Sequence, residues 1–386
     1  MLNHPKLPFS PPFYTEEESL ALRECIERRW TGTGPKTLEF EQKFCNYKST
    51  EYSAAFSSCT SALFLALKSL GIGPGDEVIT SAMTFCSTVN VIIHCGATPV
   101  LCDVDPISKN ICPNRMAELV TPRTKAFVVV HYAGYPCDMD SIMALADQYH
   151  IHVIEDCAHA IEAKYKGRHC GTFGEVGCFS FYATKNIAIG EGGMAISSHQ
   201  SLINKMSTLG LHGLSRDAWR RFESSKRKQY DVIDLGYKMN LTDLQSSVGL
   251  VQLSRLEEMT AVRQSLWNFY TSELSSTPLI LPSLPTDDGS VHALHLFACG
   301  LPSSIDRDEF VWRASQEYNI TLGVHYNSIP TFSAYNTYEF SSHPSYDYPV
   351  AYSWGKSTIS LSLSAAVTHT DAERIVGCIT QLLKSY

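Results

Sequence analysis

The stretch that decides the fold is FSFYATKNIAIGEGG, Phe179–Gly193, in which one lysine stands between an apolar run and a glycine-rich turn. Apolar and small residues lead up to Lys185, and a further apolar run, GGMAISS at 192–198, follows the turn. Continuous apolar runs of this length predict strands that are covered on both faces. Lys185 is therefore expected directly after a strand that ends at Thr184, in a sheltered position where an ammonium group is costly.

Similar apolar runs recur through the preceding part of the chain, and helical segments separate them. Strands that alternate with helices predict a mostly parallel sheet with helices on both faces, which is the α/β class. In such sheets, ligands gather at the carboxyl ends of the strands. The runs are EVITSAM at 77–83, TPVLCDVD at 98–105, KAFVVVHY at 125–132, HIHVIEDCAH at 150–159 and VGCFSFYAT at 176–184.

The residues after Pro282 follow another pattern, which predicts a smaller α+β unit. A chain of 386 residues is also too long for one ordinary core. We therefore expect a large α/β domain over residues 1–255 and a small C-terminal α+β domain over residues 256–386. The elements expected in the small domain are strands at 291–301 and 357–364 and helices at 304–318 and 368–383.

Three local patterns set further expectations. Thr15 and Glu18 have the spacing of a capping box at the start of the first helix. A helix rich in Leu and Val is expected from Thr242 to about Thr260. Between these helices, SRDAWRRFESSKRKQYD at 215–231 is polar and basic, so it is either a solvated surface loop or a segment that covers a site.

The overall composition excludes several classes of protein. Hydrophobic residues make up 44% of the chain and charged residues 18%, which is typical of a folded chain. The formal net charge of −8 argues against nucleic acid or an anionic membrane as the main partner, and no apolar run is long enough to span a bilayer. The 13 cysteines include no C-x-x-C pair, so we expect free thiols in a reducing, cytoplasmic compartment.

Two residues at strand ends suggest the chemistry. A sheltered lysine loses its proton easily, and its neutral amine can form a Schiff base with an aldehyde. Pyridoxal phosphate (PLP) needs such a lysine, an acidic partner for its ring nitrogen and a phosphate cradle. Lys185 is the candidate lysine, and Asp156, at the end of HVIED, is the candidate acid. The alternatives are a surface lysine and an aspartate that caps a helix or forms a salt bridge.

A phosphate cradle is predicted in SSCTSALFLALKSLG at 57–71, where Thr60 is expected to cap a helix that begins at Ser61. The free N–H groups at a helix N-terminus bind phosphate, and the hydroxyl of Ser180 can add to them. Phe85 follows another predicted strand, and its ring can stack on a pyridine. The alternatives are a helix cap without a ligand and a core phenylalanine.

Two other motifs carry no function. GIGPG at 71–75 differs from a dinucleotide fingerprint and follows a helix, so we interpret it as a turn with Gly71 ending the helix. His150 and His152 fall on opposite sides of a strand start, and we expect no metal site.

The residues from VIEDCAHAIEAKYKGRHCGTFGEVGCFSFYATKNIAIGEGG resemble the DegT/StrS family of PLP-dependent nucleotide-sugar aminotransferases. The resemblance continues through GIGPGDEVITSAMTF, GATPVLCDVD, TPRTKA, VHYAG and GYKMNLTDLQSSVGL, and it covers nearly the whole chain. It implies the type I PLP aminotransferase fold, whose large domain has a mostly parallel seven-stranded sheet. It also implies a homodimer with active sites at the subunit interface.

The resemblance implies roles for the residues around the cofactor ring. Lys185 is the catalytic lysine that forms the Schiff base with PLP, and Asp156 pairs with the ring nitrogen. His159 stands where the family has a residue near the ring hydroxyl, and Phe85 occupies the ring-stacking position.

The same resemblance implies where the phosphate and the substrate bind. Asn240, in GYKMNLTD, matches an asparagine that reaches the phosphate of the neighbouring subunit's cofactor. The remaining matches are Thr60, Ser61 and Ser180 for the phosphate and His325 and Tyr326, in GVHY, for the substrate.

The implied reaction is a ping-pong amino transfer from an amino acid, usually glutamate, to a nucleotide-linked keto-sugar. The segments SAMTF, TPRTKA, HYAG and YKMNLTD look closest to members that aminate sugar C4. The alternatives are amination at C3, a sugar dehydratase of the same family and a regulatory protein that binds PLP without catalysis. Dehydratases of this family typically have histidine at the position of Lys185, which argues against them.

Overall fold

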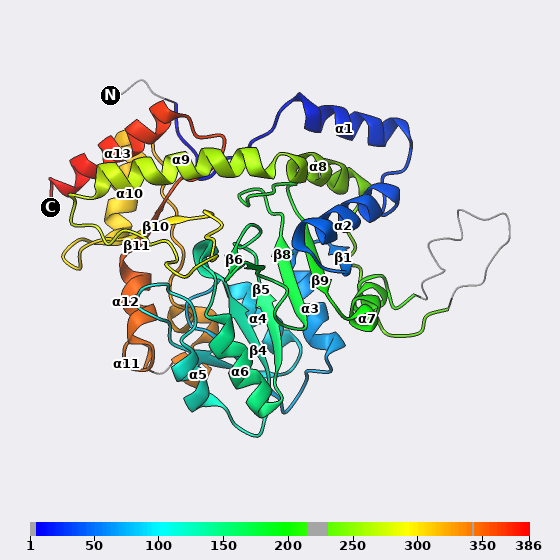
Figure 1. The fold of residues 1–386 in the computed structure, drawn as a ribbon. Coiled ribbons are helices and arrows are strands. Elements are labelled where there is room, and N and C mark those ends of the chain that lie inside the picture. The colour runs from blue at the N-terminus through cyan, green and yellow to red at the C-terminus, as the bar shows by residue number, and fades with distance from the viewer. Residues whose placement is uncertain (1–4, 215–230, 342) are drawn as a thin grey trace.

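A computed structural model describes residues 5–214, 231–341 and 343–386. Its centre is a seven-stranded sheet in the order β1-β9-β8-β5-β4-β2-β3 (Figure 1). Only β9 runs antiparallel to its neighbours, because all other pairs in the sheet are parallel. The strands of this sheet are β1 Tyr52–Phe56, β2 Glu77–Ser81, β3 Thr98–Cys102, β4 Thr124–Val130, β5 His152–Asp156, β8 Val176–Ser180 and β9 Gly193–Ser197.

The strands of the sheet are buried on both faces because helices cover them. One core joins α3, α4 and α7 to the sheet, and another joins α2 and α8 to its opposite face (Figure 1). The predicted α/β class and mostly parallel sheet are thus confirmed. The helices up to this point of the chain are α1 Glu16–Glu27, α2 Pro35–Lys48, α3 Cys59–Ser69, α4 Cys86–His94, α5 Pro113–Leu119, α6 Met139–Tyr149, α7 Gln200–Gly210 and α8 Asp243–Ser254. A small hairpin of β6 (Lys164–Tyr165) and β7 (Arg168–His169) follows β5.

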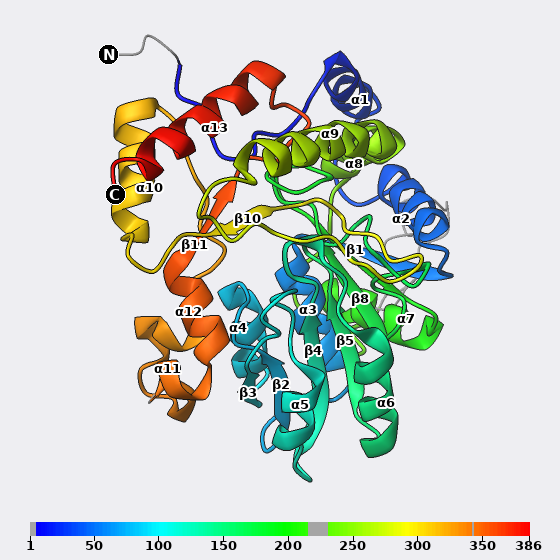
Figure 2. The same ribbon diagram turned by 60° about the vertical axis from the view of Figure 1, so that its left-hand side comes forward.

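The C-terminal part forms a second core around the antiparallel pair β10–β11, which lies beyond the carboxyl ends of the large sheet (Figure 2). The first half of α9 packs in the core of the large sheet, and its second half packs in the second core. We propose a domain boundary at Arg255, although Leu7 also packs in the second core. The elements are α9 Leu256–Leu274, β10 Phe297–Gly300, α10 Arg307–Tyr318, α11 Pro344–Asp347, α12 Pro349–Ser357, β11 Thr358–Leu361 and α13 His369–Leu383.

Several predicted boundaries need correction. The capping box of Thr15 and Glu18 is present, but the helix that Thr242 caps ends at Ser254 and not near Thr260. The backbone of Arg255 leaves the helical region, with φ −105° and ψ 9°, and its guanidinium pairs with the buried carboxylate of Glu18 on α1. That ion pair fixes the side chain of Arg255 at the position where α8 ends and α9 begins.

Two further expectations concern the loops. The strand that contains Phe179 ends at Ser180, so Lys185 lies in the loop after β8 and not directly after the strand. The polar segment 215–231 falls almost entirely outside the described residues. Gly71 has a φ of +83° just after α3, so it does end that helix as expected.

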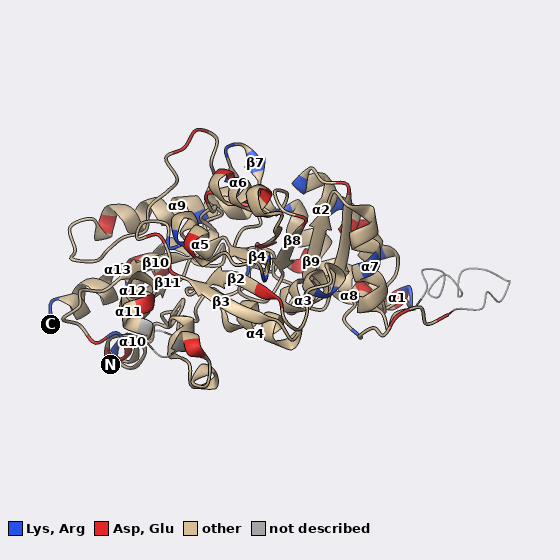
Figure 3. Ribbon diagram, turned by 90° about the horizontal axis from the view of Figure 1, so that it is seen from below, with Lys and Arg blue, Asp and Glu red and all other residues tan. Residues whose placement is uncertain are grey.

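The described part of the chain contains no helix long and apolar enough to cross a membrane. Figure 3 shows Lys and Arg scattered among Asp and Glu along the ribbon, rather than gathered on one face.

Candidate active site

Asp156 and Lys185 lie at the carboxyl ends of β5 and β8, which are neighbours in the sheet. Asp156 is the last residue of β5 and is only 4% exposed, and it pairs in register with Cys178 on β8. Lys185 lies in the loop after β8, is partly exposed, and donates its backbone N–H to the carbonyl of Tyr182 at 2.8 Å. Burial lowers the pKa of Lys185 to about 8, and the charge of Asp156 opposes this shift. The amine is therefore neutral in a useful fraction of molecules near pH 8.

The carboxylate of Asp156 is held by donors on both oxygens. Oδ1 accepts the backbone N–H of Ala158 at 3.1 Å, and Oδ2 accepts the hydroxyl of Thr88 at 2.9 Å. Burial raises the pKa of Asp156, while these hydrogen bonds and the charge of Lys185 act in the opposite direction. Sequence reasoning missed Thr88, because its role depends on a contact with Asp156, which lies in a distant segment of the chain.

The N-terminus of α3 needs one correction. The N-cap is Ser58, whose hydroxyl accepts the backbone N–H of Ser61 at 3.0 Å, and the helix begins at Cys59. Thr60 is therefore an exposed residue of the first turn and not its cap. Ser58 is the N-cap residue because its extended backbone, with φ −165°, lets its hydroxyl accept the third N–H of the helix. Thr60 and Ser61 both remain in the first turn, where the positive end of the helix dipole favours an anion, but the N–H of Ser61 is already donated to Ser58.

Ser180 lies near this helix terminus because β9, its neighbouring strand, closely approaches the loop before α3. Ser180 ends β8 and pairs in register with Gly193 on β9. A Cβ atom on Gly193 would lie 2.3 Å from the carbonyl carbon of Ser58, so only glycine lets the loop before α3 lie against β9. Ser180, Ser58 and the hydroxyl of Ser61, 2.9 Å from that of Ser58, thus form one group.

The rings of His159 and Tyr326 lie beside Lys185 and contact each other. The Nδ1 atom of His159 accepts the backbone N–H of Ala133 at 3.2 Å, and its Nε2 atom lies 2.8 Å from the hydroxyl of Tyr326. Burial and the nearby Lys185 lower the pKa of His159, so the ring is neutral. Because Nδ1 accepts, Nε2 carries the proton and donates to Tyr326. The Tyr326 hydroxyl then keeps its own proton for a ligand.

Phe85 and His325 each contact the ring of Tyr326. Phe85 is 56% exposed, which rules out the alternative of a core phenylalanine, and its ring centroid is 5.8 Å from that of Tyr326. The Nδ1 atom of His325 lies 2.9 Å from the hydroxyl of Ser360 on β11. The small unit therefore supplies His325 and Tyr326 to a site whose other members come from the large sheet.

Asn240 lies next to the predicted phosphate cradle of its own chain. It forms an isolated β-bridge with Phe56, the last residue of β1, and its amide donates to the hydroxyl of Thr33 at 2.6 Å. The neighbouring Met239 carbonyl accepts the N–H of Ser57 at 2.7 Å.

The side chain of Asn186, the residue directly after Lys185, forms a set of hydrogen bonds that was not predicted. Its amide nitrogen donates to Glu162 at 2.8 Å and to the Ala293 carbonyl at 2.8 Å. Its amide oxygen lies 3.0 Å from Nδ1 of His295, and Arg263 pairs with Glu162. The members come from four separate segments, so no spacing in the sequence could have revealed this group.

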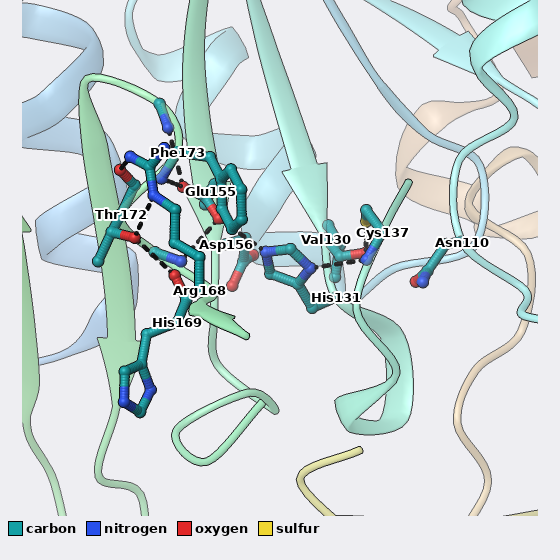
Figure 4. Close-up of polar contacts among 12 residues, drawn as sticks. Asn110, Val130, His131, Cys137, Glu155, Asp156, Arg168, His169, Thr172 and Phe173 are labelled. Atoms are coloured by element: carbon teal, nitrogen blue, oxygen red, sulfur yellow. Dashed lines mark hydrogen bonds and ion pairs between the residues drawn. The ribbon is translucent and has the colours of Figure 1, made fainter. Parts of the chain in front are cut away.

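One buried cluster has the composition of a metal site. The ligand atoms of His131, Glu155 and Cys157 lie within 4.8 Å of one another, and Figure 4 shows His131 and Glu155 pointing toward each other from the ends of β4 and β5. However, one oxygen of Glu155 accepts from Nε2 of His131 at 3.0 Å and from the N–H of Gly171 at 2.6 Å. The other accepts the N–H groups of Phe173 and Gly174. All four lone-pair positions are used, so the cluster is a structural network.

The chain matches known proteins over nearly its whole length. The model of the DegT/DnrJ/EryC1/StrS aminotransferase family matches residues 12–380. The spore coat polysaccharide biosynthesis protein SpsC of Bacillus subtilis is 41% identical over 381 residues, which cover 98% of this chain and 97% of that protein.

Solved structures with the same fold include the putative sugar aminotransferase Spr1654 from Streptococcus pneumoniae in its PLP form. It is 28% identical, with a TM-score of 0.90 over 98% of this chain and 99% of that one. The aminotransferase TlmJ from Streptoalloteichus hindustanus is 32% identical, with a TM-score of 0.89 over 98% and 99% of the two chains. The chain therefore belongs to the DegT/DnrJ/EryC1/StrS aminotransferase family and is a PLP-dependent aminotransferase with the type I fold.

Proposed function

We propose that this aminotransferase moves an amino group from L-glutamate to the C4 carbonyl of a nucleotide-linked keto-sugar. The observation that carries the proposal is the position of Lys185, in the loop after β8 and within electrostatic reach of the buried Asp156, where burial lowers the pKa of the lysine to about 8. The sugar class is supported by the names of the relatives, since Spr1654 is a putative sugar aminotransferase and SpsC is named for polysaccharide biosynthesis. Glutamate and the C4 position rest on the family resemblance of the sequence.

The donor groups of the site fit PLP. The amine of Lys185 suits the aldehyde, the carboxylate of Asp156 suits a protonated ring nitrogen, and the first turn of α3 with Ser61 and Ser180 suits the phosphate. Ser61 and Ser180 are both more than nine-tenths buried, which also suits a group that is held rather than transiently touched. When bound, PLP supplies an electron sink for the negative charge that develops when the donor loses its Cα proton.

The side chains divide the remaining work. Once its amine is free, Nζ of Lys185 takes the proton from the donor Cα and returns one later, as a general base and then a general acid. Asp156 keeps the ring nitrogen protonated by accepting its N–H. Tyr326, which accepts from neutral His159, can donate its own proton to an oxygen of the substrate. Phe85 presents an exposed ring for stacking on the pyridine.

We further propose a homodimer with its active sites at the subunit interface. Large apolar side chains are exposed in this single chain, among them Leu235 at 88% and Ile233 at 61%. They lie a few residues before Asn240, and a second copy that covered them would approach the cradle. All thirteen cysteines are free thiols, which supports the expected cytoplasmic location.

The test is a panel of nucleotide-linked 4-keto and 3-keto sugars, with L-glutamate as donor and mass spectrometry of the products. The proposal predicts amination of a 4-keto sugar by the native enzyme and none above background with Lys185→Ala. Amination of 3-keto sugars alone would replace the C4 assignment. Failure of every sugar, with a cofactor band that glutamate does not bleach, would favour a regulatory protein.

A further inference from the structure

Two threonines lie at the N-terminus of α4, with Thr88 in its first turn and Thr84 directly before the N-cap residue Phe85. Thr88 and Thr84 are fully buried, at 0% and 1% exposure. The Oγ1 atom of Thr88 lies 2.9 Å from Oδ2 of Asp156 and 2.8 Å from Oγ1 of Thr84. Phe85, the proposed stacking ring, is the N-cap residue of the same helix. One helix turn therefore carries both a face for the cofactor ring and a support for its acidic partner.

The direction of these hydrogen bonds follows from their acceptors. An ionised carboxylate can only accept, so Thr88 donates its single hydroxyl proton to Asp156. The oxygen of Thr88 must then accept from Thr84, which makes Thr84 the donor of the second bond. Helical threonines often turn their hydroxyls back to the carbonyl four residues earlier, whereas Thr88 donates across to the end of β5. Consecutive donors polarise one another, so Thr84 strengthens the bond from Thr88.

The two donors also fix how the carboxylate is oriented. Ala158 holds Oδ1 through its backbone N–H, and Thr88 holds Oδ2. The thiol of Cys59 lies 3.8 Å from Oδ1, too far to be a strong third donor. A carboxylate has about four lone-pair positions, so acceptor capacity remains for a ring N–H.

We infer that Thr88, supported by Thr84, is a positioning residue that keeps Asp156 ionised and oriented toward the nitrogen of the cofactor ring. The inference rests on the proposed role of Asp156. In an apolar pocket the carboxylate would tend to become protonated, and burial already raises the pKa of Asp156. The hydroxyl of Thr88 offsets this tendency without adding a charge, whereas an arginine or lysine there would compete with the ring nitrogen.

The test compares Thr88→Val, Thr88→Ser and Thr84→Val with Asp156→Asn. Valine keeps the volume of threonine and removes the donor, while serine keeps the donor. Two quantities are measured on each protein after reconstitution with PLP: the dissociation constant of PLP, and the pH midpoint of the visible absorption band. The other titratable groups around Asp156 are Lys185, Cys59, Cys178, His131 and Tyr326, and all four variants retain them.

Asp156→Asn is expected to weaken PLP binding and to move the midpoint to higher pH, because the ring nitrogen loses its proton and its positive charge. Thr88→Val should shift both quantities in the same direction, with binding weaker by about tenfold, as expected for loss of one hydrogen bond to a charged group. Thr88→Ser should behave as the native enzyme, and Thr84→Val should show a smaller shift of about twofold in binding.

The outcomes distinguish the proposed role of Asp156 from the proposed role of Thr88. If Asp156→Asn changes neither quantity, the role proposed for Asp156 is wrong. If Asp156→Asn shifts both and Thr88→Val shifts neither, Thr88 is only a packing residue and the inference is overturned. An equal loss in Thr88→Ser and Thr88→Val would also overturn it, since serine retains the hydroxyl. If Thr88→Val does not fold, Thr88→Ala is judged on the same two measurements.

Discussion

Lys185 owes its reactivity to partial removal from water. Its pKa of about 8 lies well below the ordinary value of 10.5, because burial disfavours the ammonium form. The charge of Asp156, and to a smaller extent Cys59, keeps this pKa from falling further. Capture of PLP by the protein stripped of cofactor should therefore speed up as pH rises, with a midpoint near pH 8. The measurement is the rate at which the visible band appears after mixing with PLP at a series of pH values.

Asp156→Asn supplies the control for this pH dependence. The carboxylate raises the pKa of Lys185, so its removal should move the midpoint of the capture rate to lower pH. A capture rate that follows an ordinary lysine, with a midpoint near 10.5, would contradict the pKa assigned to Lys185. A midpoint that does not respond to Asp156→Asn would contradict the electrostatic coupling between the two side chains.

Single residues of this site differ in how far the sequence could predict them. Lys185 and Asp156 could be predicted because each ends a recognisable apolar run and carries an unusual group there. Thr88 and Asn186 could not, because their roles depend on partners from other segments of the chain. A threonine on a helix and an asparagine in a loop are common in any sequence, so only the folded contacts give them meaning.

At the scale of elements, the helix caps show both success and error. Thr15 and Thr368 each precede a helix with an acidic residue three positions later, and both capping boxes are present. The start of α3 was placed two residues late, because SSCTS offers several hydroxyls that could cap. The backbone geometry of Ser58 decides between them, and propensity alone does not.

This difference yields a matched pair of variants. Ser58→Ala and Thr368→Ala each remove an N-cap hydroxyl, and each should lower the free energy of unfolding by about 1 kcal/mol. Ser58→Ala should also weaken PLP binding, because its hydroxyl organises Ser61 in the proposed cradle. Thr368 caps α13 in the second core and should leave PLP binding unchanged. Urea denaturation measures the change in stability, and titration with PLP measures the change in affinity. Equal PLP affinity in both variants would contradict the proposal that the first turn of α3 binds the phosphate.

At the scale of the whole molecule, the α/β class and the mostly parallel sheet follow from the alternation of apolar runs and helices. The break between α8 and α9 does not, because Leu and Val continue across Arg255 and only the ion pair with Glu18 marks it. The position of His325 and Tyr326 beside Lys185 also depends on how the second core packs on the sheet. Long-range packing of this kind leaves no local periodicity.

Asn240 allows a test of the proposed dimer. If it serves the partner's cofactor, Lys185→Ala and Asn240→Ala are each inactive alone, but a mixed dimer has one complete site. Random exchange of subunits should then restore about a quarter of native activity, since about half of the dimers are mixed and each has one of two sites. No recovery after proven exchange would mean that Asn240 acts within its own chain, where it lies beside Phe56.

The central claim is that Lys185 binds the PLP aldehyde covalently. The most direct measurement is borohydride reduction of the purified, cofactor-loaded enzyme, followed by proteolysis and mass spectrometry of the peptides. The account predicts a reduced phosphopyridoxyl group on the side chain of Lys185. An unmodified Lys185 in enzyme that contains PLP and remains active, or the group on another lysine, would contradict it.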